Sequence, residues 1–265
     1  MTADTPDATI PAGTGPQRPV RSEWTSVSVD SQPMSAYLAR PADATPRGVV
    51  LVGFEMFGLS RYIRSVTDRI ASLGYTAVAP DFYHHHGDRI DLPETTEGRE
   101  RGFQLLAALD RDEVAADASA VLDHLDASSS TTAMVGLSVG GHIAYAIATR
   151  LPLAALALFY PGWLTQPGTG LSRPEPLLDL TPQIAAHGTP VLFVIGEHDQ
   201  LYTPAERDQI AQRLGTDHVD HEMVVYPDAP HGFFCHERDT YRPEAADDAF
   251  TRLSRLLADT LPGPT

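Results

Sequence analysis

Apolar residues recur along this chain with two alternating periods, one typical of β-strands and one typical of α-helices. Residues 48–53 (GVVLVG) form a continuous apolar run, as expected of a strand that is buried on both faces. Residues 60–73 then place apolar side chains three or four positions apart, which predicts an amphipathic helix. Gly74 stands where such a helix can end.

The same alternation continues toward the C-terminus. Strands are predicted over residues 48–53, 75–79, 132–136, 153–160, 191–195 and 221–226, and helices over residues 60–73, 111–125, 140–149, 205–214 and 243–261. Before them, residues 24–30 alternate in period two and residues 34–38 follow a Ser-Gln-Pro break, which predicts a hairpin. We therefore predict an α/β fold, with a mostly parallel central sheet flanked by helices on both faces and an N-terminal antiparallel hairpin.

Length and local composition predict one folded domain. A chain of 265 residues fits a single α/β domain, which we place at residues 21–265. Residues 1–20 are rich in Thr, Pro, Ala, Gly and Asp and are predicted to be a disordered leader. Residues 165–173 (TQPGTGLSR) are predicted to form a surface loop.

The charge balance limits the classes of partner. Nineteen basic residues against 35 acidic ones give a formal net charge of −16, which repels phosphate backbones and anionic lipid. We therefore expect a small-molecule substrate, with neither nucleic acid nor membrane as a partner; monomer and homodimer both remain open. No apolar run approaches the ~20 residues of a membrane-spanning helix and no secretory signal is visible, so a cytoplasmic location is expected.

The basic residues are all arginine, and the chain has one cysteine, Cys235. Without lysine, neither a Schiff-base lysine nor a Walker A loop is possible. A single cysteine excludes an intramolecular disulfide and a cysteine zinc site.

Residues 136–140 read Gly-Leu-Ser-Val-Gly, which matches the G-x-S-x-G nucleophile elbow. An apolar strand precedes this motif and a helix follows it, as the elbow requires. Ser138 would then lie at a helix N-terminus, where the helix dipole favours a developing oxyanion. The alternative interpretation is a turn of small residues that allows a strand and a helix to pack closely.

A nucleophilic serine needs a base, and the base needs a group that orients it. Asp199 follows the predicted strand 191–195, and His231 follows the strand 221–226. The order Ser138, Asp199, His231 is that of α/β-hydrolases, and all three residues stand at carboxyl ends of predicted strands. The alternatives are an aspartate that only stabilises a turn and a histidine with a local hydrogen bond.

Taken together, these segments resemble the dienelactone hydrolase family of the α/β-hydrolase superfamily. The resemblance covers about residues 24–261 and is carried by GVVLVGFEMFGL, IRSVTDRIASLGYTAVAPDFYH, MVGLSVGGHIAYAIA, ALALFYPG, PVLFVIGEHDQLYTP and VVYPDAPHGFFC. It implies the α/β-hydrolase fold and no cofactor. It also implies that Glu55 hydrogen-bonds the resting nucleophile and that the amides of Met56 and Val139 form the oxyanion hole. The residues alone leave another role open for Glu55, an ion pair with a nearby arginine such as Arg64.

The chain departs from this family in two ways. The best-known members have a cysteine nucleophile, where this chain has Ser138. Members that cleave dienelactones hold the substrate carboxylate with two arginines, and His85 and Cys235 occupy those positions here. A dienelactone substrate is therefore not expected, unless another arginine such as Arg89 or Arg99 replaces the missing pair.

The substrate pocket is expected to include His85, Tyr160, Trp163, Phe233 and Cys235. No metal is expected at the histidine run 84–86, because adjacent side chains in an extended loop point in different directions. Cys235 lies outside the elbow and is interpreted as small apolar filler rather than as a nucleophile.

The resulting functional hypothesis is a serine hydrolase that cleaves an ester, lactone or thioester through an acyl-enzyme. Its substrate would be small to medium in size and neutral or apolar. The alternative is a biosynthetic enzyme that uses the same triad for acyl transfer, cyclisation or elimination on a hydrophobic metabolite. A catalytically silent binding module is the third hypothesis, against which the complete set of Ser, Asp and His argues.

Overall fold

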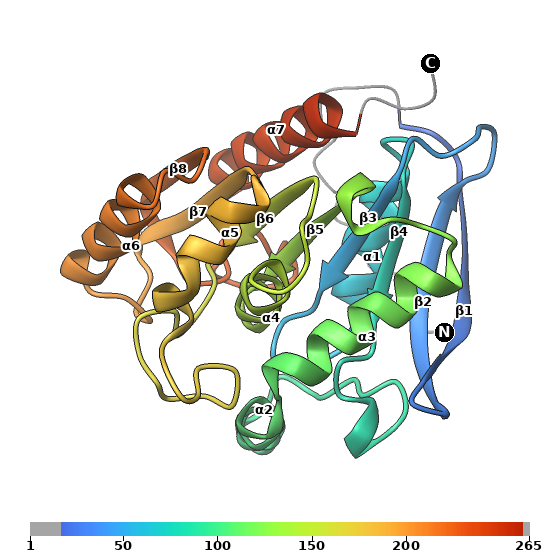
Figure 1. The fold of residues 1–265 in the computed structure, drawn as a ribbon, viewed down its shortest axis with the longest axis horizontal. Coiled ribbons are helices and arrows are strands. Elements are labelled where there is room, and N and C mark those ends of the chain that lie inside the picture. The colour runs from blue at the N-terminus through green and yellow to red at the C-terminus, as the bar shows by residue number, and fades with distance from the viewer. Residues whose placement is uncertain (1–16, 262–265) are drawn as a thin grey trace, which may run out of the picture.

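A single eight-stranded sheet runs through the computed structural model, which describes residues 17–261 (Figure 1). The strands are β1 Val20–Val29, β2 Gln32–Pro41, β3 Val49–Gly53, β4 Thr76–Pro80, β5 Thr132–Leu137, β6 Ala155–Phe159, β7 Val191–His198 and β8 His221–Pro230. Their order across the sheet is β1-β2-β4-β3-β5-β6-β7-β8. The strands β1, β2 and β4 pair antiparallel, and every pairing from β4 to β8 is parallel.

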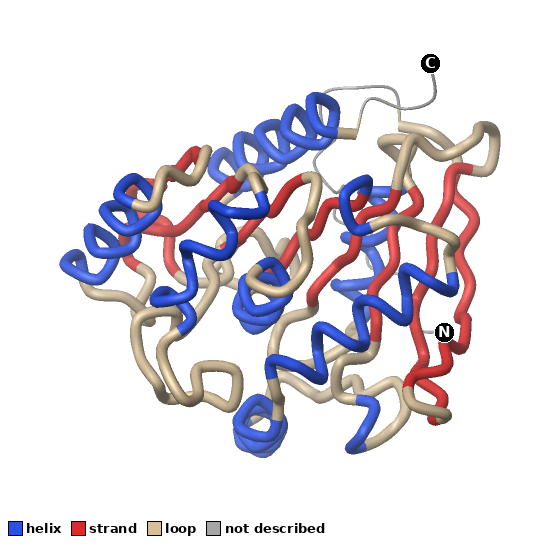
Figure 2. The backbone as a smooth tube through the Cα atoms, in the orientation of Figure 1, coloured by secondary structure: helices blue, strands red, loops and turns tan. Residues whose placement is uncertain are grey.

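Helices cover both faces of this sheet, and loops gather at its edges (Figure 2). The helices are α1 Arg61–Ala71, α2 Thr96–Ala108, α3 Arg111–His124, α4 Val139–Ala148, α5 Thr181–His187, α6 Pro204–Thr216 and α7 Pro243–Thr260, with short 3₁₀ turns at His84–His86, Ser129–Thr131 and Leu177–Leu180. Helices α3 and α4 pack against one another on one face, whereas α1 and α7 cover the other (Figure 1). The predicted α/β architecture, including the hairpin, is confirmed.

The apolar runs of the sequence become the centre of the sheet. Every residue of β5 and β6 is buried, as is all of β3 except its first residue. Helix α1 begins after Ser60, whose side chain accepts a hydrogen bond from the Ile63 amide, and it buries Ile63, Val66 and Ile70 against the sheet. Continuous apolar strands therefore require helices on both faces, as the structure has them.

The parallel register places several loops at one edge of the sheet. Gly53 at the end of β3 is the pairing partner of Gly136 in β5, so the loops after these two strands begin side by side. The loops after β6, β7 and β8 leave from the same edge, because all these strands run in the same direction. This edge holds the candidate site.

The structure describes residues 17–20 of the predicted leader and all of the predicted loop 165–173. Most of the predicted leader, residues 1–16, lies outside the described residues, and β1 already begins at Val20. The loop 165–173 is not wholly at the surface: Thr169 and Ser172 are buried, because both contact the buried imidazole of His142. Within residues 17–261, no helix combines the length and the hydropathy needed to cross a bilayer.

Candidate active site

Ser138 stands at the turn between β5 and α4 in a strained backbone conformation. Its φ of 55° and ψ of −115° are unusual for a residue with a side chain. Such conformations cost about 1–3 kcal/mol and persist only where the surrounding structure enforces them. The turn lifts the serine hydroxyl above the end of the sheet, as expected of a nucleophile elbow.

Glycines make this turn possible, because without Cβ atoms they allow α4 to approach the sheet closely. A Cβ added to Gly136 would lie 2.2 Å from the carbonyl oxygen of Gly140. A Cβ added to Gly140 would lie 2.2 Å from the carbonyl group of Gly53 in β3. Since both clashes are with backbone atoms, side chains cannot move to relieve them. The close approach of β3, β5 and α4 therefore depends on glycine at these positions.

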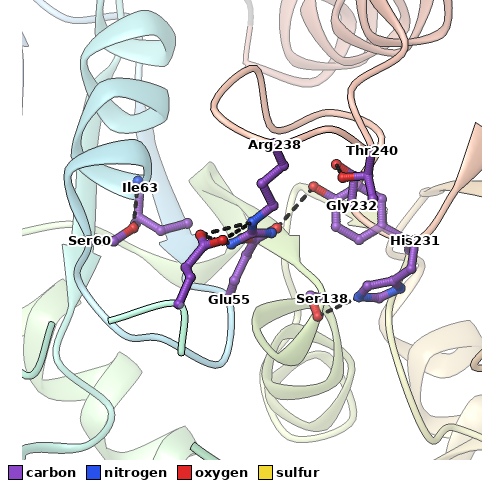
Figure 3. Close-up of polar contacts among 10 residues, drawn as sticks. Glu55, Ser60, Ile63, Ser138, His231, Gly232, Arg238 and Thr240 are labelled. Atoms are coloured by element: carbon purple, nitrogen blue, oxygen red, sulfur yellow. Dashed lines mark hydrogen bonds and ion pairs between the residues drawn. The ribbon is translucent and has the colours of Figure 1, made fainter. Parts of the chain in front are cut away.

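The structure brings Ser138, His231 and Asp199 together. The Ser138 Oγ lies 2.9 Å from His231 Nε2 (Figure 3), and His231 Nδ1 lies 2.8 Å from Asp199 Oδ2. The other oxygen of the Asp199 carboxylate, Oδ1, accepts a hydrogen bond of 2.9 Å from the Leu201 amide. Asp199 is 2% exposed, so its carboxylate is fixed by both contacts and shielded from water.

The two residues whose amides are expected to form an oxyanion hole lie near Ser138, one in the same pocket and one next to it in the chain. Met56 lies in the loop after β3 and lines the same pocket as Ser138, and Val139 is the first residue of α4. Neither amide donates a hydrogen bond to another residue in the described part of the chain. Both amides are thus free to donate to a bound group.

Glu55 does not contact the candidate nucleophile as the family resemblance implies. Its carboxylate accepts a 3.2 Å hydrogen bond from the Tyr160 hydroxyl and lies 2.6 Å from the Arg238 guanidinium (Figure 3). A buried carboxylate needs a cation, and the turn after β8 supplies one. The alternative of an arginine partner is thus the one found, but Arg64 is not that partner: it pairs with Asp91.

Arg238 joins two carboxylates at the side of the pocket. In addition to Glu55, it binds Glu94 at 2.6–2.9 Å through Nε and one terminal nitrogen. Its guanidinium also lies 5.4 Å from the ring centre of Phe57. The charge of Arg238 is therefore already balanced inside the protein.

The pocket beside Ser138 has a volume of about 210 Å³ and a mixed lining. Its walls include the apolar side chains Phe57, Phe103, Trp163 and Leu201, and the charged side chains Glu55, Glu94, Arg99 and Arg238. The side chain of Arg99, exposed in α2, has no ion-pair partner among the described residues. Of these lining residues, Trp163 and Arg99 are candidates from the sequence. The sequence carries no signal for three others: Phe103 comes from α2, Glu94 from the loop before α2, and Arg238 from the turn after β8.

Four of the residues expected in the pocket lie elsewhere. Tyr160 and Phe233 are fully buried, and their rings pack together with centroids 5.3 Å apart beneath the site. The centroid of the Tyr160 ring also lies 5.0 Å from that of the His231 ring, so Tyr160 packs against the imidazole. His85 belongs to a different cavity, because the chain turns toward α3 after β4.

The fourth of these residues, Cys235, is fully buried and does not line the pocket. Burial, with the charge of Glu55 adding to it, raises the pKa of the Cys235 thiol to about 12. At neutral pH this group is a thiol rather than a thiolate, so it is not an activated nucleophile.

Comparisons with known proteins agree with this architecture. The family model described as the dienelactone hydrolase family matches residues 34–261. A Synechocystis protein provisionally named carboxymethylenebutenolidase is 33% identical over 247 residues, which cover 89% of this chain and 97% of that protein. An Escherichia coli protein with the same provisional name is 30% identical over 260 residues, covering 94% of this chain and 87% of its own length.

A solved structure shows the same fold. The crystal structure of a provisionally named dienelactone hydrolase from Klebsiella pneumoniae superposes with a TM-score of 0.81 at 26% identity. The superposition covers 91% of this chain and 99% of that one. The similarity therefore extends over the whole domain and is not restricted to the elbow.

Proposed function

Because the chain belongs to the dienelactone hydrolase family, we propose that it is a hydrolase of the lactone and ester type with Ser138 as its nucleophile. The observation that carries this proposal is the hydrogen-bonded series from Ser138 through His231 to Asp199. A serine is a weak nucleophile unless a base accepts its proton, and this series provides that base together with its orienting carboxylate.

In the first half of the reaction, Ser138 Oγ attacks the substrate carbonyl while its proton passes to His231 Nε2. Asp199 accepts the Nδ1 hydrogen of His231, which selects the tautomer with a free Nε2 and stabilises the imidazolium that forms. The amides of Met56 and Val139 donate to the oxyanion, and one such donor is typically worth ~3–4 kcal/mol.

In the second half, the tetrahedral intermediate collapses and His231 gives its proton to the leaving oxygen, which leaves an acyl group on Ser138. Water then attacks this acyl-enzyme with His231 as the base, and the acid is released. If the substrate is a lactone, the leaving alcohol stays attached to the acyl group, so one ring-opened product results. No redox step or cofactor enters this sequence.

The preferred substrate is proposed to be small and neutral, with an apolar group next to the carbonyl. A cavity of about 210 Å³ admits only a small acyl part, and aromatic and leucine side chains form much of its wall. Two arginines and two glutamates line the pocket, so their formal charges cancel, and the chain as a whole carries a formal charge of −16. A carboxylated substrate, such as the butenolide in the relatives' name, would approach against this charge, and Arg99 is the one lining cation without a partner in the described chain.

The central test compares the wild-type protein with Ser138→Ala and with the control Cys235→Ala. We expect p-nitrophenyl acetate hydrolysis to be lost in Ser138→Ala and nearly unchanged in Cys235→Ala. By intact-mass measurement, a fluorophosphonate should add one phosphonyl group to the wild type and none to Ser138→Ala. Full activity in Ser138→Ala would remove the serine from its proposed role. Labelling of Ser138 without turnover of any ester would favour acyl transfer or another biosynthetic reaction over hydrolysis.

Substrate charge is tested separately with a neutral ester and its carboxylated analogue at about pH 8.5, which lies well above the ordinary pKa of histidine. We expect the higher kcat/KM for the neutral ester. A preference for the carboxylated ester that disappears in Arg99→Met would show that Arg99 holds the carboxylate and would refute the neutral-substrate proposal.

A further inference from the structure

A second group of polar side chains lies at the end of β4, outside the pocket that contains Ser138. The chain winds there into the 3₁₀ turn His84–His86 and packs beside α3. His84 Nε2 lies 3.1 Å from Asp117 Oδ1, and the rings of His84 and His85 stand 3.9 Å apart. One potential ligand atom from each of His84, His85 and Asp117 lies within 4.8 Å of the other two.

Residues 84–86 form a 3₁₀ turn and not the extended loop for which no metal is expected. In the 3₁₀ turn, His84 and His85 present their rings to the same side, where Asp117 reaches them from α3. Ligands in a tetrahedral zinc site stand ~2.0–2.2 Å from the ion and therefore ~3.3 Å from one another. The His84–Asp117 separation of 3.1 Å already matches this spacing.

Burial divides the group into a fixed part and a movable part. The side chains of His84 and Asp117 are each 2% exposed, so packing holds both in place. His85 is exposed, so it can rotate its ring to close the remaining distance to an ion. A preformed pair with one adjustable ligand requires little reorganisation on binding.

The surroundings also suit a cation. A cavity of about 200 Å³ adjoins the group and is lined by His85, Asp117 and Glu113, among others. It has room for water as a further ligand. Glu113 lies one helical turn before Asp117, so a second carboxylate adds negative charge at the same side of α3.

We propose that His84, His85 and Asp117 bind a divalent transition-metal ion of the zinc type. Two imidazole nitrogens, one carboxylate oxygen and water form a ligand set that suits such an ion better than calcium or magnesium. The bound ion ties the turn after β4 to α3. None of the three ligands lines the pocket at Ser138, so the proposal does not depend on the proposed hydrolase activity.

The test is calorimetric titration of the chelator-treated full-length protein with Zn²⁺ alone. We expect one equivalent to bind with a Kd of about 10 µM or tighter, and the melting temperature to rise with Zn²⁺ concentration. His85→Ala should weaken binding at least about tenfold, since loss of an outer partner alone typically has such an effect. His85 is exposed, so this variant should fold normally; Asp117→Asn provides a second ligand variant.

His86→Ala is the matched control, because His86 belongs to the same turn and lines the same cavity but does not belong to the three-ligand group. It should bind Zn²⁺ like the wild type. The proposal is overturned if the wild type shows no saturable binding up to about 100 µM, a concentration well above the expected Kd. It is equally overturned if His86→Ala loses as much affinity as His85→Ala, or if His231→Ala abolishes binding, which would place the ion at the serine site.

Discussion

The buried histidine next to the elbow should make folding stability depend on pH. His142 lies in α4, one turn after Ser138, and is completely buried. Its Nε2 lies 2.6 Å from Thr169 Oγ1 and 3.3 Å from Ser172 Oγ, so it ties the loop after β6 to the helix of the elbow. Burial, with the nearby positive charge of Arg111, lowers the pKa of His142 to about 3.

The sign and size of the effect follow from linkage. An unfolded histidine has a pKa of ~6.5 and takes up a proton below that pH, whereas folded His142 stays neutral down to about pH 3. The folded state is therefore progressively disfavoured as the pH falls from 6.5. Each pH unit in this window costs ~1.4 kcal/mol, so the loss between about pH 7.5 and pH 5 is about 2 kcal/mol from this residue.

The assay is urea unfolding of the wild type and His142→Gln at both pH values. Glutamine retains an oxygen for the Thr169 hydroxyl but cannot be protonated, so the variant should lack this part of the pH dependence. The stability advantage of the wild type should shrink by about 2 kcal/mol on going to pH 5. His124→Gln, which makes the same replacement at an exposed histidine, is the control for the substitution itself.

The reasoning is refuted if the stability difference between the wild type and His142→Gln stays constant between the two pH values within about 0.5 kcal/mol, roughly the additivity error of such differences. Should the variant fail to fold, NMR titration of the wild-type imidazoles provides the same test. A resonance of His142 that titrates near pH 6 would show that the folded protein accepts the proton.

Three further outcomes are expected. Gly140→Ala should destabilise the protein by about 3 kcal/mol or more, because its Cβ would meet the Gly53 backbone at 2.2 Å. The helical control Gly215→Ala has open space around it and should be neutral or stabilising, so equal unfolding midpoints of the two variants would contradict this reasoning. Arg238→Met should lower the free energy of unfolding by about 3–5 kcal/mol, because Glu55 is then buried without its cation. Adding Glu55→Gln should restore much of this stability in denaturation curves, and no recovery would show that the ion pair is not the cause. Native protein at about pH 8 should react slowly with a thiol reagent, because Cys235 is buried and its pKa is near 12, and fast stoichiometric labelling before unfolding would refute that placement.

The fold and the placement of the three residues proposed as the catalytic triad could be predicted from sequence patterns alone. Apolar runs such as 48–53 can be satisfied only in strands covered on both faces, and the helical spacing after them supplies the cover. Once the sheet is parallel, residues at carboxyl strand ends meet at one edge, so Ser138, Asp199 and His231 converge although they are far apart along the chain. These features depend on local patterns and on a general rule of topology.

The pairing of individual side chains, in contrast, became visible only in the three-dimensional arrangement of the loops. Glu55 finds Arg238 and Tyr160 rather than Ser138 or Arg64, because the turn after β8 carries an arginine back over the site. His85 faces Asp117 of α3 instead of the pocket, since the chain winds into a 3₁₀ turn where an extended loop was expected. Such pairings depend on the paths of loops in space, and a single charged or aromatic residue in a sequence carries no periodic signal that would reveal its partner.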